Sequence, residues 1–536
     1  MTFRFIFVGL ALLFLGGCQK KTTSHRKDIP EHQRYLNISF HTDLQSLDPR
    51  KGIDFPTFFV MKMLFEGLTH VGSDGNIRPG IAKSWDVSED QKTYTFHLRP
   101  SAWSNGDKVT AYDFEYSWKK MLDPKDPSLG IQSFFPVKNA HAISLGQKPL
   151  ESAGFKAIDA YTIEVELEYP TPYFLELVST PPYFAISQGV DQLGHEWMKE
   201  TGDGFVCNGP FKLEKLHYTD EILVIKNPSY WEADQVKLPG IRIAIIKDMT
   251  TQMNLFEKGE LHWLGNPLSK FPLDAIKHMK RTNQLKFMPT LSVYWYFVNT
   301  EAFPFQNKKM RQAFAYAVNR KLLSETILEG ADPPATAVLP YSLATQEDPF
   351  FQDNNLALAQ QLFQEALDEM EISREDLPSI TLNYVSTDPE YVRVAEATQQ
   401  QWNTAFGIDV HLEHQDWRGH YSKLQSGSFQ LGGMGWQTWI RDSIYILQTF
   451  QKKDLGINMS RWENAQFQEL LAKAEVEADL ARRKQLYNEA EAILMEEMPV
   501  IPIYFMTSKY AQSNKLKNVF LSDLYEADFR WAYLEE

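Results

Sequence analysis

The chain has 536 residues, of which 43% are hydrophobic and 23% charged, and its formal net charge is −15. A single hydrophobic core stops growing at roughly 250 to 300 residues, so we expect two or more lobes. The excess of acidic side chains argues against a nucleic-acid partner, because a negative surface without a strong basic patch repels phosphates.

The first residues have the pattern of an export signal. Arg4 supplies a positive charge, and Phe5 to Leu15 form an apolar run that is too short to span a bilayer stably. The run continues into Gly16-Gly17-Cys18 and resembles the lipobox of bacterial lipoproteins. This resemblance implies cleavage before Cys18, lipid on Cys18, and a protein anchored to a membrane in the periplasm or cell envelope. Residues 19–33 would then be a flexible tether; the alternative is an ordinary signal peptide with a chance cysteine.

The stretch from Ala82 to Pro124 predicts a strand, a tight turn and a helix in that order. Tyr94, Phe96 and Leu98 alternate with polar residues, as in a strand with one buried face. Asn105-Gly106 supplies the left-handed backbone of a tight turn. Thr110 precedes Asp113 by three residues, close to the capping-box pattern of a helix start. The apolar residues of the helix are at helical spacing, namely Phe114, Trp118, Met121 and Leu122.

Strand patterns dominate the rest of the first half. Apolar residues alternate at Tyr161 to Leu167, Ile222 to Ile225 and Ile241 to Ile246, with turns rich in Pro and Gly between them. Cys207 lies beside one of these strands and is interpreted as a small buried hydrophobe. Because Cys18 is the only other cysteine, we expect no disulfide framework.

The second half changes to alternating helices and strands. An amphipathic helix is predicted from Ala359 to Met370, and a strand at Ile380 to Tyr384 follows. A helix through Ala397 to Phe406 then leads to a strand at Ile408 to Leu412. Strands joined by helices of this length pair in parallel, so we expect an α/β lobe from about Val293 to Phe505.

No enzyme signature is present in the sequence. It has no phosphate-binding P-loop, no dinucleotide glycine fingerprint, no G-x-S-x-G elbow and no HExxH helix. His411 and His414 would point to opposite faces of a strand, which argues against a shared metal. We therefore expect a protein that is not an enzyme and that needs no metal or cofactor.

The order of residues from Ala82 to Pro124 closely resembles the signature of extracytoplasmic peptide-binding proteins, the oligopeptide and dipeptide receptors of ABC importers. The resemblance combines SW, TYTFHLR, WSNGD and TAYDFEYSW in one contiguous run. Similar stretches cover nearly the whole chain: SLDP at 46–49, LFEGL at 64–68, NGPFKL at 208–213, NPSYW at 227–231, RQAFAYAVNR at 311–320 and PVIPIYF at 499–505.

This resemblance implies an α/β, two-lobed periplasmic-binding-protein fold of the peptide-binding class, with an extra domain, three domains in all and a ligand cleft between the lobes. Residues 1–18 would be the signal peptide with its lipidation cysteine. A discontinuous first domain would comprise 34–57, 199–291 and 508–536, an additional strand-rich domain 58–198, and a second α/β lobe 292–507.

The implied function is that of a lipid-anchored substrate-binding component of an ABC importer. Such a receptor captures oligopeptides between its lobes and delivers them to a permease and its ATPase, and we expect it to act as a monomer. Two alternatives remain open at this point. The same fold could bind a nickel chelate, haem or a sugar, or the chain could be a surface lipoprotein with an adhesion or signalling role.

Aromatic side chains are the first candidates for the cleft, because binding sites combine apolar surfaces with a few polar anchors. Core packing is the alternative for each of them. By resemblance, the tryptophan of the expected strand His414 to Trp417, the tryptophan after Gly435, and the acid upstream of SLDP line the cleft. The candidates are Asp43, Tyr294, Trp295, Tyr296, Trp417, Trp436 and Trp439.

The family pattern fails just after Trp436. Oligopeptide receptors usually carry GWxxD there, with the aspartate pairing the peptide ammonium, and this chain has Trp439 in place of the acid. An unpaired buried ammonium is costly by several kcal/mol. Either Asp442 or Asp43 therefore substitutes for the missing acid, or the ligand differs from an ordinary peptide. A cell-wall peptide, whose terminal chemistry is different, would be such a ligand. Arg441 and Arg393 could take an anionic group; solvated surface charge is the alternative for both.

Overall fold

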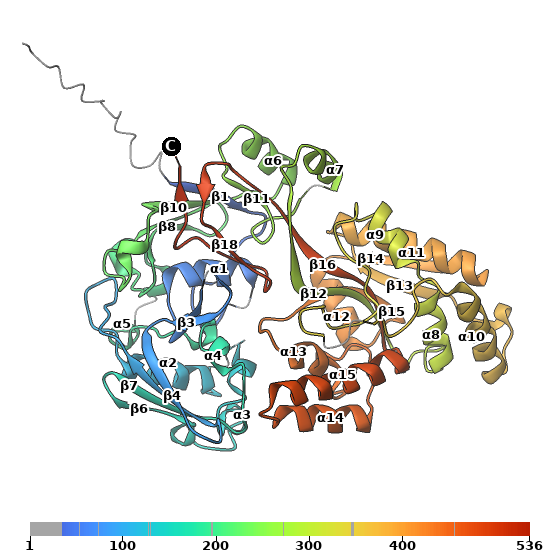
Figure 1. The fold of residues 1–536 in the computed structure, drawn as a ribbon, viewed down its shortest axis with the longest axis horizontal. Coiled ribbons are helices and arrows are strands. Elements are labelled where there is room, and N and C mark those ends of the chain that lie inside the picture. The colour runs from blue at the N-terminus through green and yellow to red at the C-terminus, as the bar shows by residue number, and fades with distance from the viewer. Residues whose placement is uncertain are drawn as a thin grey trace, which may run out of the picture.

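The computed structural model describes residues 35–535 except 45, 53, 73, 127, 129, 195–196, 272, 345–347 and 455. Two lobes lie side by side, one built mainly from the first half of the chain and one from the second (Figure 1). Across the described ranges, no helix is both long enough and apolar enough to cross a membrane. The expected export signal, Cys18 and the expected tether lie outside the described residues.

The first lobe contains two four-stranded sheets. In one, the order is β1 (Leu36–Phe40), β10 (Gly240–Ile245), β9 (Glu221–Lys226) and β8 (Phe211–His217), and only the β1/β10 pair is parallel. In the other, the order is β4 (Ala82–Val87), β5 (Thr93–Leu98), β7 (Thr162–Glu166) and β6 (Phe155–Asp159), all antiparallel. The strands expected from alternation are therefore confirmed.

Helix α2 (Ala111–Leu122) follows β5 as predicted. The backbone N–H of Thr110 donates to Asp113 Oδ2 at 2.8 Å, which is half of the predicted capping box. The four apolar residues predicted for its inner face are buried, and Trp118 donates its indole N–H to the carbonyl of Tyr183. The tryptophans of this signature stretch thus build the scaffold.

Short elements complete the first lobe. Its helices are α1 (Phe55–Leu64), α3 (Ala140–Ser144), α4 (Phe174–Leu177), α5 (Gln188–Asp191), α6 (Met249–Glu257) and α7 (Leu273–Arg281). Three two-stranded pairs are β2 (Thr69–Val71) with β3 (Ile77–Pro79), β17 (Leu516–Lys517) with β20 (Tyr533–Leu534), and β18 (Phe520–Ser522) with β19 (Glu526–Asp528). The last two pairs come from the C-terminal segment, which returns to this lobe (Figure 1).

The second lobe is built on a six-stranded mixed sheet. Its order is β11 (Trp263–Gly265), β16 (Val500–Gln512), β12 (Lys286–Val298), β15 (Leu431–Gln437), β13 (Ile380–Val385) and β14 (Val410–Gln415). β13 and β14 are parallel and are joined by α11 (Pro389–Phe406), which confirms the predicted βαβ unit. The other helices are α8 (Lys308–Tyr316), α9 (Arg320–Thr326), α10 (Leu356–Glu369), α12 (Trp417–Ser426), α13 (Ile444–Leu447), α14 (Ala465–Glu475) and α15 (Leu480–Glu497).

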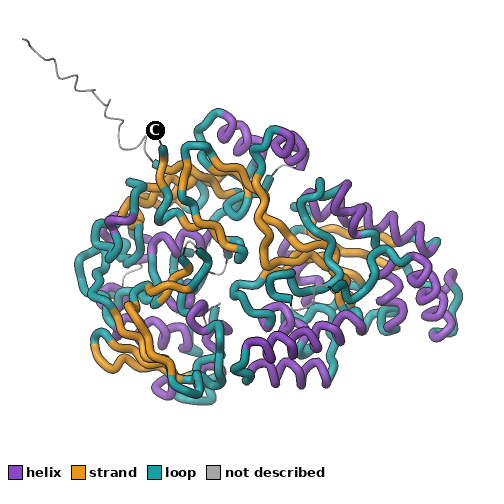
Figure 2. The backbone as a smooth tube through the Cα atoms, viewed as in Figure 1, coloured by secondary structure: helices purple, strands orange, loops and turns teal. Residues whose placement is uncertain are grey.

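Two long antiparallel strands join the lobes. β12 and β16 have 13 residues each and pair from Lys286 with Tyr510 to Phe297 with Val500. β11 extends the same sheet towards the first lobe through its pairing with β16 (Figure 2). The domain boundaries expected at 291/292 and 507/508 fall inside these two strands. The first lobe has one continuous group of buried residues, so its division into two domains stays a prediction.

Candidate functional site

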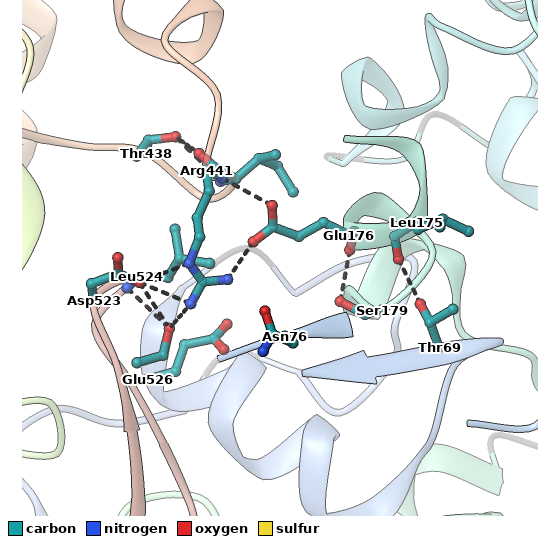
Figure 3. Close-up of polar contacts among 12 residues, drawn as sticks. Thr69, Asn76, Leu175, Glu176, Ser179, Thr438, Arg441, Asp523, Leu524 and Glu526 are labelled. Atoms are coloured by element: carbon teal, nitrogen blue, oxygen red, sulfur yellow. Dashed lines mark hydrogen bonds and ion pairs between the residues drawn. The ribbon is translucent and has the colours of Figure 1, made fainter. Parts of the chain in front are cut away.

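The loop after β15 brings the second lobe against the first. Arg441 Nη1 lies 2.8 Å from Glu176 Oε1, and its backbone N–H donates to Glu176 Oε2 at 3.0 Å. On its other side, Arg441 Nη2 lies 2.8 Å from Asp523 Oδ1 and donates to Ser522 Oγ. Figure 3 shows Arg441 between these partners, which belong to α4 and to the β18–β19 hairpin. One guanidinium therefore ties together three distant segments of the chain.

Burial governs the electrostatics of this contact. Desolvation raises the pKa of Glu176, and the attraction of Arg441 opposes this rise without cancelling it. The side chain of Glu176 is 9% exposed, whereas those of Arg441 and Asp523 are 26% and 33% exposed. Glu176 therefore depends on Arg441 more than Asp523 does, because little solvent reaches it.

Neighbouring residues of this loop and of the following helix α13 also contact the first lobe. Ile440 is buried among the core residues of the first lobe. Trp439 lies against Phe58 of α1, with 5.0 Å between ring centroids. Tyr445 meets Tyr173 edge to face at 5.7 Å. This part of the contact between the lobes thus combines apolar packing with the ion pair of Arg441.

Two pockets share part of their lining on the first lobe. The first-lobe pocket is lined by α1, β2 and the C-terminal hairpin, and it contains several charged groups: Lys62, Glu66, His70, Glu526, Asp528 and Arg530. The boundary pocket is mostly apolar and is lined by Phe40, Pro56, Phe58, Phe59, Lys62, Pro267, Leu268, Trp439, Tyr525, Glu526 and Ala527. Trp439 is the lining residue that the second lobe contributes to the boundary pocket.

A buried carboxylate anchors the C-terminal segment beside the first-lobe pocket. Glu66 is 1% exposed and lies 2.6 Å from Arg530 Nη1. Tyr230 and Trp231 donate hydrogen bonds to the same carboxylate. Burial alone would raise the pKa of Glu66, but Arg530, His70 and Trp231 outweigh it and lower that pKa to about 2. This group is therefore ionised at any physiological pH.

A second buried charge cluster lies where β16 crosses between the lobes. Lys509 Nζ lies 2.5 Å from Asp332 and 2.9 Å from Glu390. Burial raises the pKa of Asp332, although Lys509 opposes the rise. Nearby, Lys270 of the first lobe pairs with Asp388, which caps α11 in the second. The two lobes are therefore linked by ion pairs at two places.

The structure places Tyr294, Trp295 and Tyr296 in the core of the second lobe. None has exposed surface, and none lines either pocket, so core packing is favoured over the expected cleft position. They lie on β12, where Tyr294 pairs with Gly435 and Tyr296 with Gly433 of β15. A Cβ on Gly433 would come within 2.4 Å of the Tyr294 hydroxyl oxygen. The glycines are thus needed to make room for this aromatic layer.

The other predicted site residues are dispersed. Trp436 is partly buried and stacks on Trp295 at 5.8 Å. Trp417 begins helix α12 instead of ending a strand, because β14 stops at Gln415, and it is 50% exposed. Asp43 pairs with Lys247 at 2.8 Å, and Asp442 pairs with Arg483 at 3.3 Å. Neither acid lines either of these two pockets, and Arg393 is exposed on α11.

Sequence reasoning missed the partners from the first lobe. Glu176, Asp523 and Phe58 carry no local signal, because their role depends on residues that are distant in the sequence. The acid inside LFEGL, Glu66, could have been noted as a charge within an apolar run. Within the described residues, no group of three or more His, Cys, Asp or Glu is arranged to hold a metal ion.

Comparisons with known proteins agree with this architecture. A family model for "Bacterial extracellular solute-binding proteins, family 5 Middle" matches residues 76–456. The chain is 37% identical to the oligopeptide-binding protein OppA of Bacillus subtilis, covering 93% of this chain and 92% of that protein. It is 32% identical to the dipeptide-binding protein DppE of the same species, covering 98% of both.

Solved structures are similar over nearly the whole chain. The murein tripeptide binding protein MppA of Escherichia coli gives a TM-score of 0.80 at 27% identity, covering 94% of this chain and 98% of that one. OppA of Haemophilus influenzae in complex with RPPGFSPFR gives a TM-score of 0.80 at 26% identity, covering 94% and 99%. The expected α/β, two-lobed periplasmic-binding-protein fold is confirmed.

Proposed function

The chain belongs to family 5 of the bacterial extracellular solute-binding proteins, and on that premise we propose that it captures peptides between its lobes and delivers them to an ABC importer. Relatives named for oligopeptide and dipeptide binding cover more than nine-tenths of the chain. The family description places such proteins outside the cytoplasm. The permease and ATPase of an importer are the partners that this role requires.

One observation about β15 carries the proposal. β12 pairs with β15 from Leu431 to Gln437, but on the opposite edge the described pairing with β13 stops at Gly432. The backbone from Met434 to Gln437 therefore has one edge that no described strand covers. An extended peptide can bind such an edge through main-chain hydrogen bonds, whatever its side chains. This edge leads directly into the loop that contacts the first lobe.

Lobe closure would follow from binding at this place. A ligand that contacts both lobes favours the closed arrangement over the open one. Trp439, Ile440 and Arg441 follow β15 within four residues and contact the first lobe in this conformation. A peptide on β15 would thus lie beside the contacts that form when the lobes meet.

We also propose that the peptide amine is not held by a carboxylate near residue 439. Trp439 occupies that place, and both candidate acids, Asp43 and Asp442, already form ion pairs. Peptides with different terminal chemistry, such as those from cell walls, would suit this arrangement. Titration calorimetry with free and N-acetylated tripeptides tests the idea. Comparable affinity is expected, and loss of binding on acetylation would contradict it.

Two measurements test the wider proposal. Trp436→Ala should weaken peptide binding about tenfold while leaving the fold intact, because it removes a large aromatic surface at the edge of β15. Unchanged affinity would remove Trp436 from the site. Mass spectrometry of ligand that purifies with the protein should detect peptides; a metal chelate, haem or sugar in their place would contradict a peptide receptor.

The anchor is a separate part of the proposal. Cys18 lies outside the described residues, and its lipobox-like context supports lipid attachment. Cells grown with labelled fatty acid should label the wild-type protein and not Cys18→Ala, which should be released from membranes. Equal release of both proteins would contradict anchoring through this residue.

A further inference from the structure

The boundary pocket is walled mainly by hydrocarbon surface. Phe40, Pro56, Phe58 and Phe59 come from β1 and the start of α1, and Pro267 and Leu268 come from the segment after β11. Phe40 and Phe59 pack edge to face at 5.6 Å, which fixes one wall. The second lobe supplies Trp439, whose ring contacts Phe58.

The charged groups of this pocket are already paired with each other. Lys62 Nζ lies 2.5 Å from Glu526 Oε1, and both side chains are less than one-quarter exposed. The hydroxyl of Tyr525 accepts a hydrogen bond from the Asn266 amide. A charged group entering here would lose its hydration and would have to break the Lys62–Glu526 pair to find a partner, which is costly in a partly buried site.

The neighbouring first-lobe pocket shows what a site for charged groups would look like. It shares Phe59, Lys62, Glu526 and Ala527 with the boundary pocket, so the Lys62–Glu526 pair borders both. Beyond that pair lie Glu66, His70, Asp528 and Arg530. Most of the charged residues thus belong to the first-lobe pocket, and the charged lining of the boundary pocket is limited to the Lys62–Glu526 pair.

We propose that the boundary pocket selects an uncharged apolar side chain of the bound peptide, with Trp439 and Phe58 as the specificity-determining pair. This inference rests on the proposed peptide-binding function and adds a preference at one position of the cargo. The pocket lies where the loop after β15 meets the first lobe, so the side chain would be enclosed as the lobes come together. Burial of its apolar surface would then favour the closed arrangement.

A positional set of tripeptides tests the proposal on the full chain. Each peptide is built from alanine with Phe, Leu, Lys or Glu at one position, and binding is measured by calorimetry. The wild type should prefer Phe or Leu over Lys and Glu by about tenfold or more at one position. Trp439→Ala and Phe58→Ala should reduce that preference to about threefold or less. Tyr112→Ala, at an exposed aromatic residue on α2 outside both pockets, is the matched control and should keep it.

A variant that adds a negative charge to the pocket sharpens the test. Trp439→Asp should favour Lys over Phe at the same position, with thermal melting confirming that the variant is folded. A wild-type preference for Lys that Glu526→Gln abolishes would overturn the proposal, because the pocket would then accept a cation. Equal affinity for all side chains at every position would overturn it too, while leaving peptide binding intact. Failure to bind any tripeptide or longer peptide would instead contradict the proposed function.

Discussion

Ile440 and Leu524 cross the boundary between the lobes in opposite directions. Ile440 follows the second-lobe strand β15 and is buried in the core of the first lobe. Leu524, at the tip of the C-terminal hairpin, is buried in the core of the second lobe. Each lobe thus covers an apolar residue of the other. Opening the lobes would expose both residues to water, which opposes opening when no ligand is present.

Arg441→Ala should shift the protein towards an open arrangement. The change leaves Glu176 buried without its guanidinium partner, and we expect a loss of about 1–3 kcal/mol from the closed state. Small-angle X-ray scattering should show a larger radius of gyration without ligand, and peptide affinity should fall. Lys473→Ala removes an exposed pair with Glu469 and is the control. Glu176→Gln in the Arg441→Ala background should recover part of the loss; no recovery would argue against this account.

Arg530→Ala should strongly destabilise the first lobe, by about 3–5 kcal/mol, because it strands the buried Glu66 carboxylate. The pKa of Glu66 is lowered to about 2, so its stabilising effect is present above pH 4.5 and is lost as the pH falls towards 2. Urea unfolding at pH 7 and at pH 3 measures the free energy of unfolding of the wild type and of each variant. The wild type should lose stability between the two values, and Glu66→Gln should lose less; equal pH dependence would contradict the assignment.

The carboxyl group of Glu491 on α15 should give the stability of the protein the opposite pH dependence. It is 1% exposed, accepts backbone hydrogen bonds from Val338 and Leu339, and burial raises its pKa to about 8. The folded state therefore holds this proton more tightly than the unfolded state. Its contribution to stability is full below pH 4.5 and is lost as the pH rises through about 8.

Glu491→Gln keeps a side-chain oxygen that can accept both backbone hydrogen bonds, and it removes the titratable carboxyl group. The variant should gain stability relative to the wild type as the pH rises from 5 to 9, by about 3–5 kcal/mol at most. Thermal melting over this range is the measurement. A constant difference between the two proteins would show that Glu491 does not change protonation on unfolding.

Gly433→Ala should disturb β15. The added methyl group would lie 2.4 Å from the Tyr294 hydroxyl oxygen and 3.1 Å from the Tyr296 ring, so the aromatic layer would have to move. We expect a destabilisation of about 1–3 kcal/mol and weaker peptide binding. Gly189→Ala, where no atom lies within 4 Å of the added Cβ, is the control and should be close to neutral. Equal melting temperatures for the two variants would contradict this packing.

Local sequence patterns predicted individual helices and strands, but they could not predict which distant residues contact each other. The alternation at Tyr94 to Leu98 and the cap at Thr110 depend only on near neighbours, and both are present in the structure. Arg441 and Glu176 are 265 residues apart, and one sequence contains no signal that joins them. Trp417 was expected in a strand, but Asp416 accepts a hydrogen bond from the Gly419 N–H and caps a helix there instead.

The aromatic run at Tyr294 to Tyr296 shows why residue types alone do not distinguish a binding surface from a core. Aromatic side chains suit both a binding surface and a core, and the choice depends on what faces them. Here the glycines of β15 face Tyr294 and Tyr296, so the rings fill the space that side chains on β15 would otherwise occupy. The residues that pair with this run across the sheet decide which role it takes, and the sequence of the run does not identify them.

The pairing of Glu66 with Arg530 also limits when the first lobe can be completed during folding. The two residues are 464 positions apart, and the first lobe also needs Phe529 to complete its core. A chain that is synthesised from its N-terminus therefore cannot complete its first lobe until nearly the whole chain is available.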